Sequence, residues 1–511
     1  MRTKLMTRLG TLAALVMVSS GLNVSQAAAT AAENVSVQWS KVTGASLATP
    51  TLQVVVNPLL RPPSPVARRA LLAVQRLKAD YVRFVPWLPY PQLAVAELYP
   101  PSQGKTFWNF KLIDPMVRAF MHASDDRPVI MNFSTIPEWM FKTKKPVTWP
   151  KNPDQVTWNY EQGTQLRDAS LKTLAGYYAR LVSWYTRGGL RDEYGHWHAS
   201  GYHYKFAWWE VLNEVNFEHH MNVQEYTRWY DAITKAIHKV SPDTKFVGMA
   251  MAMGQSAGYL PWYKYFLNLS NHAPGTPLDM ISFHFYASPP ANAAPSQWPN
   301  IFFSQAQQFL TVASKIAQYR KEESPNTLLN VDELGSILPY DTAPKLVRPI
   351  PHMYWNLTGA MYAYLYVRLA QQGVNVVGES QLIGYPSQFP SVSMIHWTTG
   401  APNARFRVLE LLVRNCGPGD KMVHTNVAIV AHNGRKASQL FAQAFVTPAG
   451  AKRVLLVNMG DSPSRVSIAG AAGAQEMWVD QITGSKQPGA RTLPHDAFSI
   501  GGLGVAVIKL K

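Results

Sequence analysis

Short apolar runs alternate with longer amphipathic segments between about residue 50 and residue 415. Most of the runs are almost continuously apolar, which is typical of strands that are buried on both faces of a parallel sheet. The runs are TLQVVVNP (51–58), ADYVRFVPW (79–87), PVIMNFS (128–134), FAWWEVLNE (206–214), KFVGMAMA (245–252), MISFHFYA (280–287), TLLNVDELG (327–335) and VNVVGESQL (374–382). The pattern therefore predicts eight parallel strands.

The segments between these runs repeat apolar residues every three or four positions, as amphipathic helices do. The clearest helical segments are 64–78, 112–124, 166–186, 222–240 and 358–373. Strands that alternate with helices in this way predict an α/β fold, a (β/α)8 TIM barrel with enlarged loops. An open doubly wound sheet is the alternative, but no Gly-x-Gly-x-x-Gly follows the first run, which disfavours a dinucleotide-binding fold.

The amino-acid composition and the spacing of apolar runs change after the helical segment 404–415. Residues 416–511 are rich in Gly, Ala and Val, and turn residues separate short apolar runs at intervals of roughly ten, which predicts an accessory β-sandwich domain. Residues 33–48 contain NVSVQWSKV, which alternates like a strand, and we assign this segment to the same sandwich. The predicted catalytic barrel then occupies residues 49–415.

Residues 1–32 have the pattern of a secretory signal peptide. Basic residues at positions 2, 4 and 8 precede the apolar stretch 9–18, and small residues follow at 27–32. The apolar stretch is too short to span a bilayer, and no later run is long enough. We therefore expect a secreted or periplasmic protein without a transmembrane segment. A single cysteine, Cys416, excludes an internal disulfide and a zinc site built on several thiolates.

The formal net charge is +17, which favours anionic partners such as an acidic polysaccharide. The basic residues are scattered instead of clustered, which disfavours nucleic acid as a partner. The chain also has 16 Trp and 23 Tyr, and these can stack on sugar faces or simply fill a large core. Neither the charge nor the aromatic content decides the oligomeric state.

Two glutamates end apolar runs, and such a position is costly for a carboxylate that nothing uses. Glu214 ends the fourth run and Glu333 ends the seventh. In a parallel barrel the carboxyl ends of the strands form one face, so both carboxylates are expected at the barrel mouth. Two carboxylates about 5 Å apart can cleave a glycosidic bond with retention of configuration, one as proton donor and the other as nucleophile.

The W-E-V-x-N-E strand end and the later strand-ending glutamate resemble clan A of the retaining glycoside hydrolases. Within the clan the chain most resembles family 39, the β-xylosidase and α-L-iduronidase group. The resemblance implies that Glu214 is the general acid/base and Glu333 the nucleophile. It also implies that Asn213 binds the sugar hydroxyl next to the anomeric carbon.

The resemblance extends to groups around the two glutamates. It implies that Arg83 and Tyr286 hold the nucleophile in its ionised form, and that His284 lines the same floor. The segment IPEWM (136–140) resembles the strand-3 segment of the family, which makes Trp139 a candidate for substrate binding.

The chain departs from the family pattern at two positions. Family members usually have Pro after Asn-Glu, where this chain has Val215, and Thr or a small residue before the nucleophile, where it has Asp332. An acid beside the nucleophile either alters its pKa or points to the other face of the strand.

Other polar and aromatic residues near the strand ends are further candidates. Glu379 would bind substrate or a neighbouring basic residue, and Trp397 is the tryptophan that we favour as a sugar platform. Glu210 is expected to face the helix layer. The Pro-rich segment 288–304, which follows strand 6, is expected to shape the cleft.

Other functions fit parts of this pattern: an inactive carbohydrate-binding barrel, a metal-dependent hydrolase, and an adhesin or nucleic-acid binder held by charge. The presence of both glutamates opposes the first. A metal site would use histidines near strand 4, but these lack metal-binding spacings, and we expect neither a metal nor a cofactor. The histidines are His196, His198, His203, His219 and His220. The substrate is expected to be a carbohydrate, either an acidic one or a neutral xyloside or arabinoside.

Overall fold

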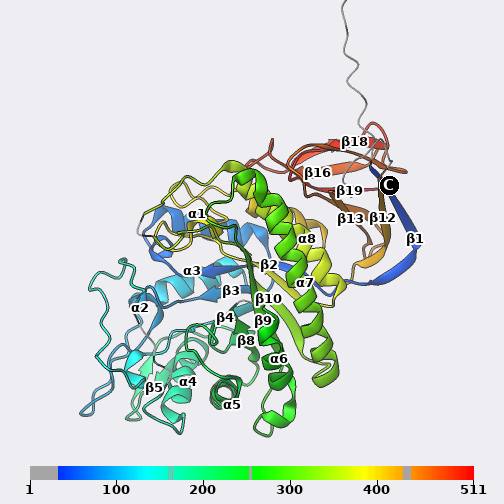
Figure 1. Ribbon diagram of the computed structural model, residues 1–511. Coiled ribbons are helices and arrows are strands. Elements are labelled where there is room, and N and C mark those ends of the chain that lie inside the picture. Colours follow the sequence, from blue (N-terminus) through cyan, green and yellow to red (C-terminus); the bar gives the residue numbers. More distant parts are fainter. Residues whose placement is uncertain are drawn as a thin grey trace, which may run out of the picture.

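The computed structural model describes residues 33–158, 160, 163, 165–252, 256–343, 345–429 and 439–511. The expected signal peptide, residues 1–32, lies outside the described residues. The described chain forms a barrel and a second, strand-rich domain that packs against the barrel (Figure 1). Within the described residues, no helix is long and apolar enough to cross a membrane.

Eight parallel strands close into a barrel, which confirms the predicted fold class. Each strand lies within one of the eight predicted apolar runs or overlaps it, and the last strand, β11, pairs with the first, β2. In order around the barrel the strands are β2 (Thr49–Val55), β3 (Val82–Val85), β4 (Val129–Met131), β7 (Trp208–Glu210), β8 (Lys245–Met251), β9 (Met280–Ala287), β10 (Leu328–Ser336) and β11 (Val376–Glu379).

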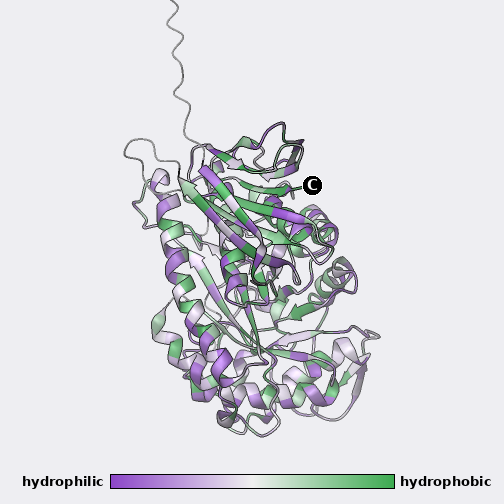
Figure 2. Ribbon diagram, turned by 90° about the vertical axis from the view of Figure 1, so that its right-hand side faces the viewer, coloured by the Kyte–Doolittle hydropathy of each residue, from purple (hydrophilic) through white to green (hydrophobic). Residues whose placement is uncertain are grey.

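Helices surround the barrel strands and present their apolar faces to them (Figure 2). They are α1 (Pro65–Leu77), α2 (Pro91–Ala94), α3 (Asp114–Ser124), α4 (Lys172–Thr186), α5 (Val223–Val240), α6 (Leu260–Leu267), α7 (Trp298–Glu323), α8 (His352–Gln371) and α9 (Ala404–Asn415). Several begin at a side-chain cap; for example, Asn222 accepts a hydrogen bond from the backbone N–H of Glu225 at the start of α5. Because α7 begins at Trp298, only the first part of segment 288–304 is a loop.

Short elements connect these helices and strands. The strands β5 (Gly189–Arg191) and β6 (Trp197–Ala199) form a small hairpin. Single 3-10 turns are η1 (Pro58–Leu60), η2 (Glu138–Met140), η3 (Ala257–Tyr259), η4 (Leu269–Asn271), η5 (Pro295–Gln297) and η6 (Pro390–Val392).

The second domain is one nine-stranded, mostly antiparallel sheet. The N-terminal strand β1 (Glu33–Ala45) pairs antiparallel with β12 and parallel with β15, so the two ends of the described chain share this sheet (Figure 1). The other strands are β12 (Lys421–Ile429), β13 (Leu440–Val446), β14 (Lys452–Asn458), β15 (Ser464–Ile468), β16 (Gln475–Val479), β17 (Gly489–Thr492), β18 (Ala497–Ile500) and β19 (Val505–Lys509).

Alternation along the strands gives this sheet two buried faces. Val454 and Leu456 of β14 belong to the core of the domain itself. Leu455 and Val457 point the other way and join the core of the barrel. The ring of Phe441 also contacts Tyr364 of α8, with 5.1 Å between the ring centroids. The sheet is therefore joined to the barrel by apolar packing instead of a flexible linker.

The barrel interior has an apolar end and a polar end. Side chains of Ile130, Trp208, Val247, Met280 and Val376 fill the end where the strands begin. Toward the carboxyl ends of the strands the buried side chains become polar and charged. This layering places the buried charges directly under the barrel mouth.

Candidate active site

The chain leaves strand β7 through an irregular backbone that carries Glu214 to the barrel mouth. Leu212 has φ +65° and Glu214 has φ +42°, values that L-residues rarely adopt. The N–H of Glu214 donates to the carbonyl of Ala250 at 2.8 Å, which fixes this turn against β8. Strained backbone of this kind persists where the surrounding structure holds it, and it concentrates at functional sites.

A β-bulge in β10 turns two successive acidic side chains into the barrel. Asn330 pairs with Ser282 and Glu333 pairs with His284, so one extra residue of β10 lies between the two pairs. Asp332 therefore approaches Arg83 and His284 inside the barrel, below Glu333, and does not point to the other face. Bulges next to active sites commonly re-aim side chains in this manner.

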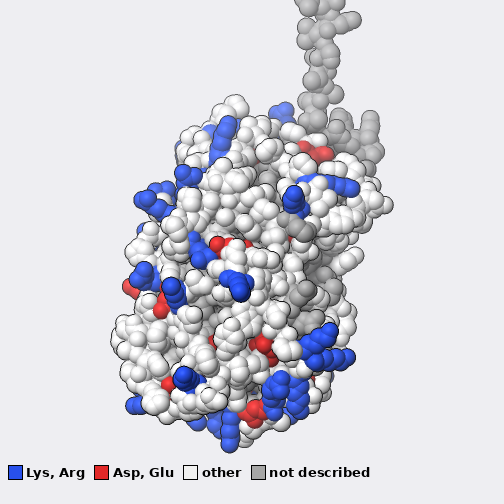
Figure 3. Space-filling model, turned by 90° about the vertical axis from the view of Figure 1, so that its left-hand side faces the viewer, with Lys and Arg blue, Asp and Glu red and all other residues white. Residues whose placement is uncertain are grey.

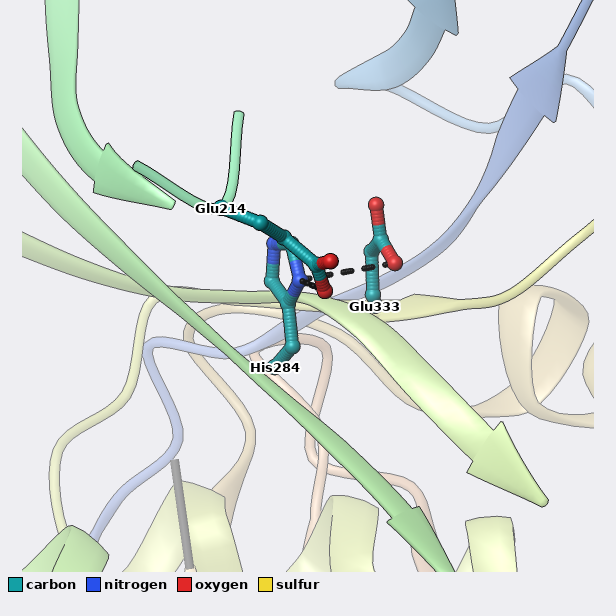
Figure 4. Close-up of side chains that lie close together, drawn as sticks. All are labelled: Glu214, His284 and Glu333. Atoms are coloured by element: carbon teal, nitrogen blue, oxygen red, sulfur yellow. Dashed lines mark hydrogen bonds and ion pairs between the residues drawn. The ribbon is translucent and has the colours of Figure 1, made fainter. Parts of the chain in front are cut away.

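Glu214, His284 and Glu333 converge at the mouth (Figure 4). One oxygen of each glutamate and one ring nitrogen of His284 all lie within 4.8 Å of one another. The Nδ1 atom of His284 is 2.9 Å from Oε1 of Glu214 and 3.4 Å from Oε2 of Glu333. The two carboxylates keep a small opening to solvent, with 17% and 10% of their side chains exposed, whereas His284 is buried.

Arg83, from β3, ties the polar residues beneath the mouth together. Its Nη1 donates to Glu333 Oε1 and to Gln53 Oε1, each at 2.6 Å, and its Nη2 donates to Asn213 Oδ1 at 2.7 Å. Its Nε donates to Glu210 Oε2 at 2.5 Å. The guanidinium therefore orients both Glu333 and Asn213, and four of its five N–H groups donate within the protein.

Glu210 faces the barrel interior, contrary to the expectation that it would face the helix layer. Besides Arg83, its carboxylate accepts hydrogen bonds from Asn132 Nδ2 at 2.6 Å and Ser282 Oγ at 2.5 Å. Its strand neighbour Trp209 packs in the helix layer instead, against Phe133 and Tyr178. Glu210 is thus a buried support of Arg83.

The buried charges shift one another's protonation. Burial would lower the pKa of Arg83, but Glu210, Asp332 and Glu333 together raise it above its ordinary value. Burial would raise the pKa of Asp332, but Arg83 and His284 hold it below its ordinary range. The pKa of His284 is raised well above its ordinary value by Glu333, Asp332 and Glu214, against the effect of burial. The three carboxylates around His284 therefore favour its protonated form.

Tyr286, two residues after His284 on β9, holds the second oxygen of Glu333. Its hydroxyl donates to Glu333 Oε2 at 2.7 Å and lies 2.5 Å from Ser380 Oγ. Burial and the negative charge of Glu333 raise the pKa of Tyr286 well above its ordinary value. The phenol therefore keeps its proton and remains a donor to the carboxylate.

A pocket of about 540 Å³ opens above these groups. Asn213, Glu214, Tyr286 and Glu333 form part of its lining, and residues of β2 and β3 and of the loops after β3, β10 and β11 complete it. Trp87 and Phe389 supply an aromatic wall, with 6.0 Å between their ring centroids. Two amide side chains, those of Gln53 and Gln381, also line the pocket. Aromatic faces with a few amide groups suit a sugar ring, which has apolar faces and a hydroxyl-bearing edge.

Three predicted substrate-binding residues lie outside this pocket. Trp139 lines a separate hollow with Arg167, and its indole donates to the carbonyl of Glu97 at 2.9 Å. Trp397 stacks on His396 in the turn before α9. Glu379 is fully buried and paired with Arg405 of α9 at 2.9 Å, because its side chain points out of the barrel toward that helix. We therefore do not retain these three as lining residues.

The structure adds residues that sequence reasoning missed. Trp87 and Phe389 come from loops, where no periodicity distinguishes a pocket wall from any other surface. Gln53 lies in the middle of an apolar strand, and its polarity there was an available signal. Glu218 lies one turn beyond Glu214, and its Oε1 accepts from Trp87 Nε1 at 2.6 Å and from Asn213 Nδ2 at 2.8 Å.

The histidines near strand 4 do not converge on one site. His196 and His198 flank Asp192 in the β5–β6 hairpin, whereas His219 is buried between Phe141 and Trp229. The trio at the barrel mouth, Glu214, His284 and Glu333, does have the spacing of metal ligands.

Comparisons with known structures place the fold among glycosidases. A GH51 arabinofuranosidase from Xanthomonas axonopodis pv. citri is 10% identical with a TM-score of 0.63, and the match covers 94% of this chain and 100% of that one. An α-L-arabinofuranosidase from Thermotoga maritima is 15% identical with a TM-score of 0.59 and the same coverage. A GH30 endoxylanase from Clostridium papyrosolvens C71 is 12% identical with a TM-score of 0.55, again with 94% and 100% coverage.

The barrel and its accessory sheet therefore have the fold of these solved structures. The model of the family "Glycosyl hydrolases family 39" matches residues 23–351, more than half of the chain. The chain therefore belongs to glycoside hydrolase family 39. No curated protein sequence matches it.

Glu218 gives a prediction about pH. Burial, with the negative charge of Glu214, raises its pKa to about 8 from an ordinary value of 4.5. Folding therefore takes up a proton between these values, so this residue makes the fold less stable as pH rises through that window. We expect Glu218→Gln, which stays neutral, to gain thermal stability relative to wild type as pH rises from 4 to 9.

The control for this prediction is Glu218→Ala, which removes the acceptor of Trp87 and Asn213. We expect Glu218→Ala to raise KM on an aryl glycoside substrate, whereas Glu218→Gln keeps the acceptor oxygen and stays close to wild type. Melting temperatures of wild type and Glu218→Gln, measured at several pH values, test the predicted gain in stability. A difference between Glu218→Gln and wild type that does not change with pH would contradict it.

Proposed function

We propose that this family 39 protein is an exported retaining glycosidase in which Glu333 is the nucleophile and Glu214 the general acid/base. The observation that carries the proposal is the separation of the two carboxylates, of which one oxygen each lies within 4.8 Å of the other. Carboxylates about 5 Å apart suit double displacement, whereas inverting enzymes need a wider gap to admit water. The proposal of export rests on the signal-peptide pattern of residues 1–32.

In the first step the glycosidic bond breaks and a glycosyl–enzyme ester forms. Glu214 donates its proton to the glycosidic oxygen, while an oxygen of Glu333 attacks the anomeric carbon and the leaving group departs as an alcohol. Hydrogen bonds from Arg83 and Tyr286 hold the two oxygens of Glu333 in position before the attack. Because both donors are buried, they are positioned without the cost of ordering water.

In the second step water cleaves the ester. Glu214, now ionised, removes a proton from a water molecule, the water oxygen bonds to the anomeric carbon, and Glu333 is released as a carboxylate. The ring nitrogen Nδ1 of His284, 2.9 Å from Glu214 Oε1, holds this carboxylate in position for the proton transfer. Two inversions at the same carbon give a product with the configuration of the substrate.

The pocket lining favours a neutral sugar at the reacting position. None of the described residues that line the pocket is Lys, Arg or His. The two basic groups beneath it are already engaged: Arg83 has four hydrogen-bond partners, and His284 lies between Glu214 and Glu333. A sugar carboxylate would therefore lie beside Glu214 and Glu333 without a free cation to pair with. We propose a neutral glycoside as the substrate at this position, despite the basic character of the whole chain.

Product stereochemistry tests the proposal. The wild-type enzyme is incubated with nitrophenyl glycosides of neutral pentoses, neutral hexoses and glucuronic acid, and proton NMR follows the anomeric signal before mutarotation. We expect the first product to have the configuration of its substrate, and turnover to be fastest with a neutral sugar. Release of the opposite anomer would refute double displacement, and a preference for the glucuronide would refute the neutral pocket.

A further inference from the structure

The protein carries a large excess of positive charge. The sequence has a net charge of +17, and Lys and Arg predominate over Asp and Glu on the face shown in Figure 3. A cleft of about 1090 Å³ lies on the flank of the barrel, between α1 and α9, with Gln487 of the second domain at its edge. We call it the arginine cleft, because Arg69, Arg76, Arg407 and Arg414 line it.

The arginines of this cleft are only partly neutralised. Among its lining residues the one carboxylate is Glu410, which accepts from Arg407 Nη1 at 3.0 Å and Arg414 Nη2 at 2.5 Å. Arg69 donates to the carbonyl of Thr399, an uncharged partner. Arg76 is exposed and makes no hydrogen bond or ion pair with any described residue. Four cations against one anion leave an excess positive charge. Arg69, Arg76 and Arg414 are exposed, whereas Arg407 is mostly buried and also donates to the carbonyl of Ser485.

The spacing of the cations suits an extended polyanion. Arg69 and Arg76 lie seven residues apart on α1, and Arg407 and Arg414 lie seven residues apart on α9, so each pair is about 10 Å apart along its helix. The cleft thus has two rows of guanidinium groups, and guanidinium forks pair well with carboxylates. A linear chain with repeated carboxylates would contact both rows.

The position of the cleft relates it to the barrel mouth. Barrel helices begin on the side where the strands end, so the end of the cleft at Arg69 and Gly400 lies nearer the mouth than the end at Arg76 and Arg414. The turn that carries Gly400 also carries Trp397, which is half-buried and stacked on His396. This tryptophan offers a sugar-stacking surface beside the cleft.

We propose that the arginine cleft binds a chain of acidic polysaccharide at a site separate from the catalytic pocket. The cleft would hold the enzyme on an acidic polymer while the pocket cleaves neutral glycosides. The assignment to polysaccharide instead of another polyanion rests on the proposed glycosidase function. The only aromatic side chain among the described lining residues, Phe406, is buried, so the cleft itself has no surface on which nucleic-acid bases could stack.

Affinity electrophoresis of the mature full-length protein in gels containing polygalacturonate tests this site. We expect wild type to be retarded, and the double variant Arg69→Gln/Arg76→Gln to bind at least tenfold more weakly. The matched control is Arg118→Gln/Arg228→Gln, which removes two exposed arginines from α3 and α5 and has the same net charge. We expect the control to bind like wild type, and all three proteins to hydrolyse an aryl glycoside equally.

Two results would overturn the proposal. Equal loss of binding in the control would show that net charge alone is responsible, and unchanged binding of Arg69→Gln/Arg76→Gln would exclude the cleft. Gels containing single-stranded DNA form the second arm, and retardation there equal to that by polygalacturonate would assign the cleft to polyanions in general. Binding of polygalacturonate is measured independently of hydrolysis. A lack of glycosidase activity would therefore refute the proposed function, but it would not show whether the arginine cleft binds polysaccharide.

Discussion

Glu333→Gln should reduce kcat by about 10,000-fold or more, equivalent to about 5 kcal/mol of activation free energy. The amide is close to isosteric with the carboxylate, so it can accept from Arg83 and lie beside Tyr286, but it is not a nucleophile. We expect the variant to fold and to bind sugar with an affinity close to that of wild type. Initial rates on aryl glycosides, with circular dichroism as the check on folding, measure the effect.

The comparison with Glu214→Gln separates the two roles. A substrate with a good leaving group needs little proton donation, so Glu214→Gln should form the glycosyl–enzyme from an activated aryl glycoside and then hydrolyse it slowly. Mass spectrometry should detect the accumulated ester on Glu333 in this variant. Glu322→Gln, an exposed position on α7, is the matched control and should be fully active. An ester found on Asp332 would contradict the assignment of the nucleophile.

The barrel was predictable because the hydrophobic pattern that indicates it extends over most of the chain. Eight nearly continuous apolar runs, separated by amphipathic segments, leave few arrangements other than a closed parallel sheet. The ends of these strands also give the approximate place of Glu214 and Glu333, since parallel strands end on one face. What the pattern cannot give is the local backbone that decides where each side chain points.

Three residues show that the hydrophobic pattern does not determine where a side chain points. Asp332 points inward because of a bulge, and period-two alternation cannot foresee an inserted residue. Glu379 ends a strand as Glu333 does, but the register aims it at Arg405 of α9. Burial raises the pKa of Glu379 to about 7 against the effect of Arg405, which identifies a structural pair instead of a sugar contact. Trp397 lies in the loop after β11, the eighth barrel strand. This loop lies against α1, because the carbonyl of Thr399 accepts a hydrogen bond from Arg69.

Arg83→Met should be the most destabilising single substitution in the site. The guanidinium is buried and lies against three carboxylates, those of Glu210, Asp332 and Glu333. Removing one partner of a buried charge pair typically costs about 3–5 kcal/mol, because the remaining charges stay buried without compensation. We expect the free energy of unfolding in urea to fall by roughly this amount, together with a loss of activity from misplaced Glu333 and Asn213.

A second substitution distinguishes loss of charge balance from loss of packing. In Arg83→Met/Asp332→Asn one of the uncompensated carboxylates is also removed, so the double variant should recover part of the lost stability while remaining inactive. Arg83→Lys keeps the charge but cannot reach Glu333, Asn213 and Glu210 at once, so it should be more stable than Arg83→Met and still have little activity. If Arg83→Met and Arg83→Lys lose the same stability, the guanidinium supports the fold by its shape and hydrogen bonds, and charge compensation under the barrel mouth is not its main role.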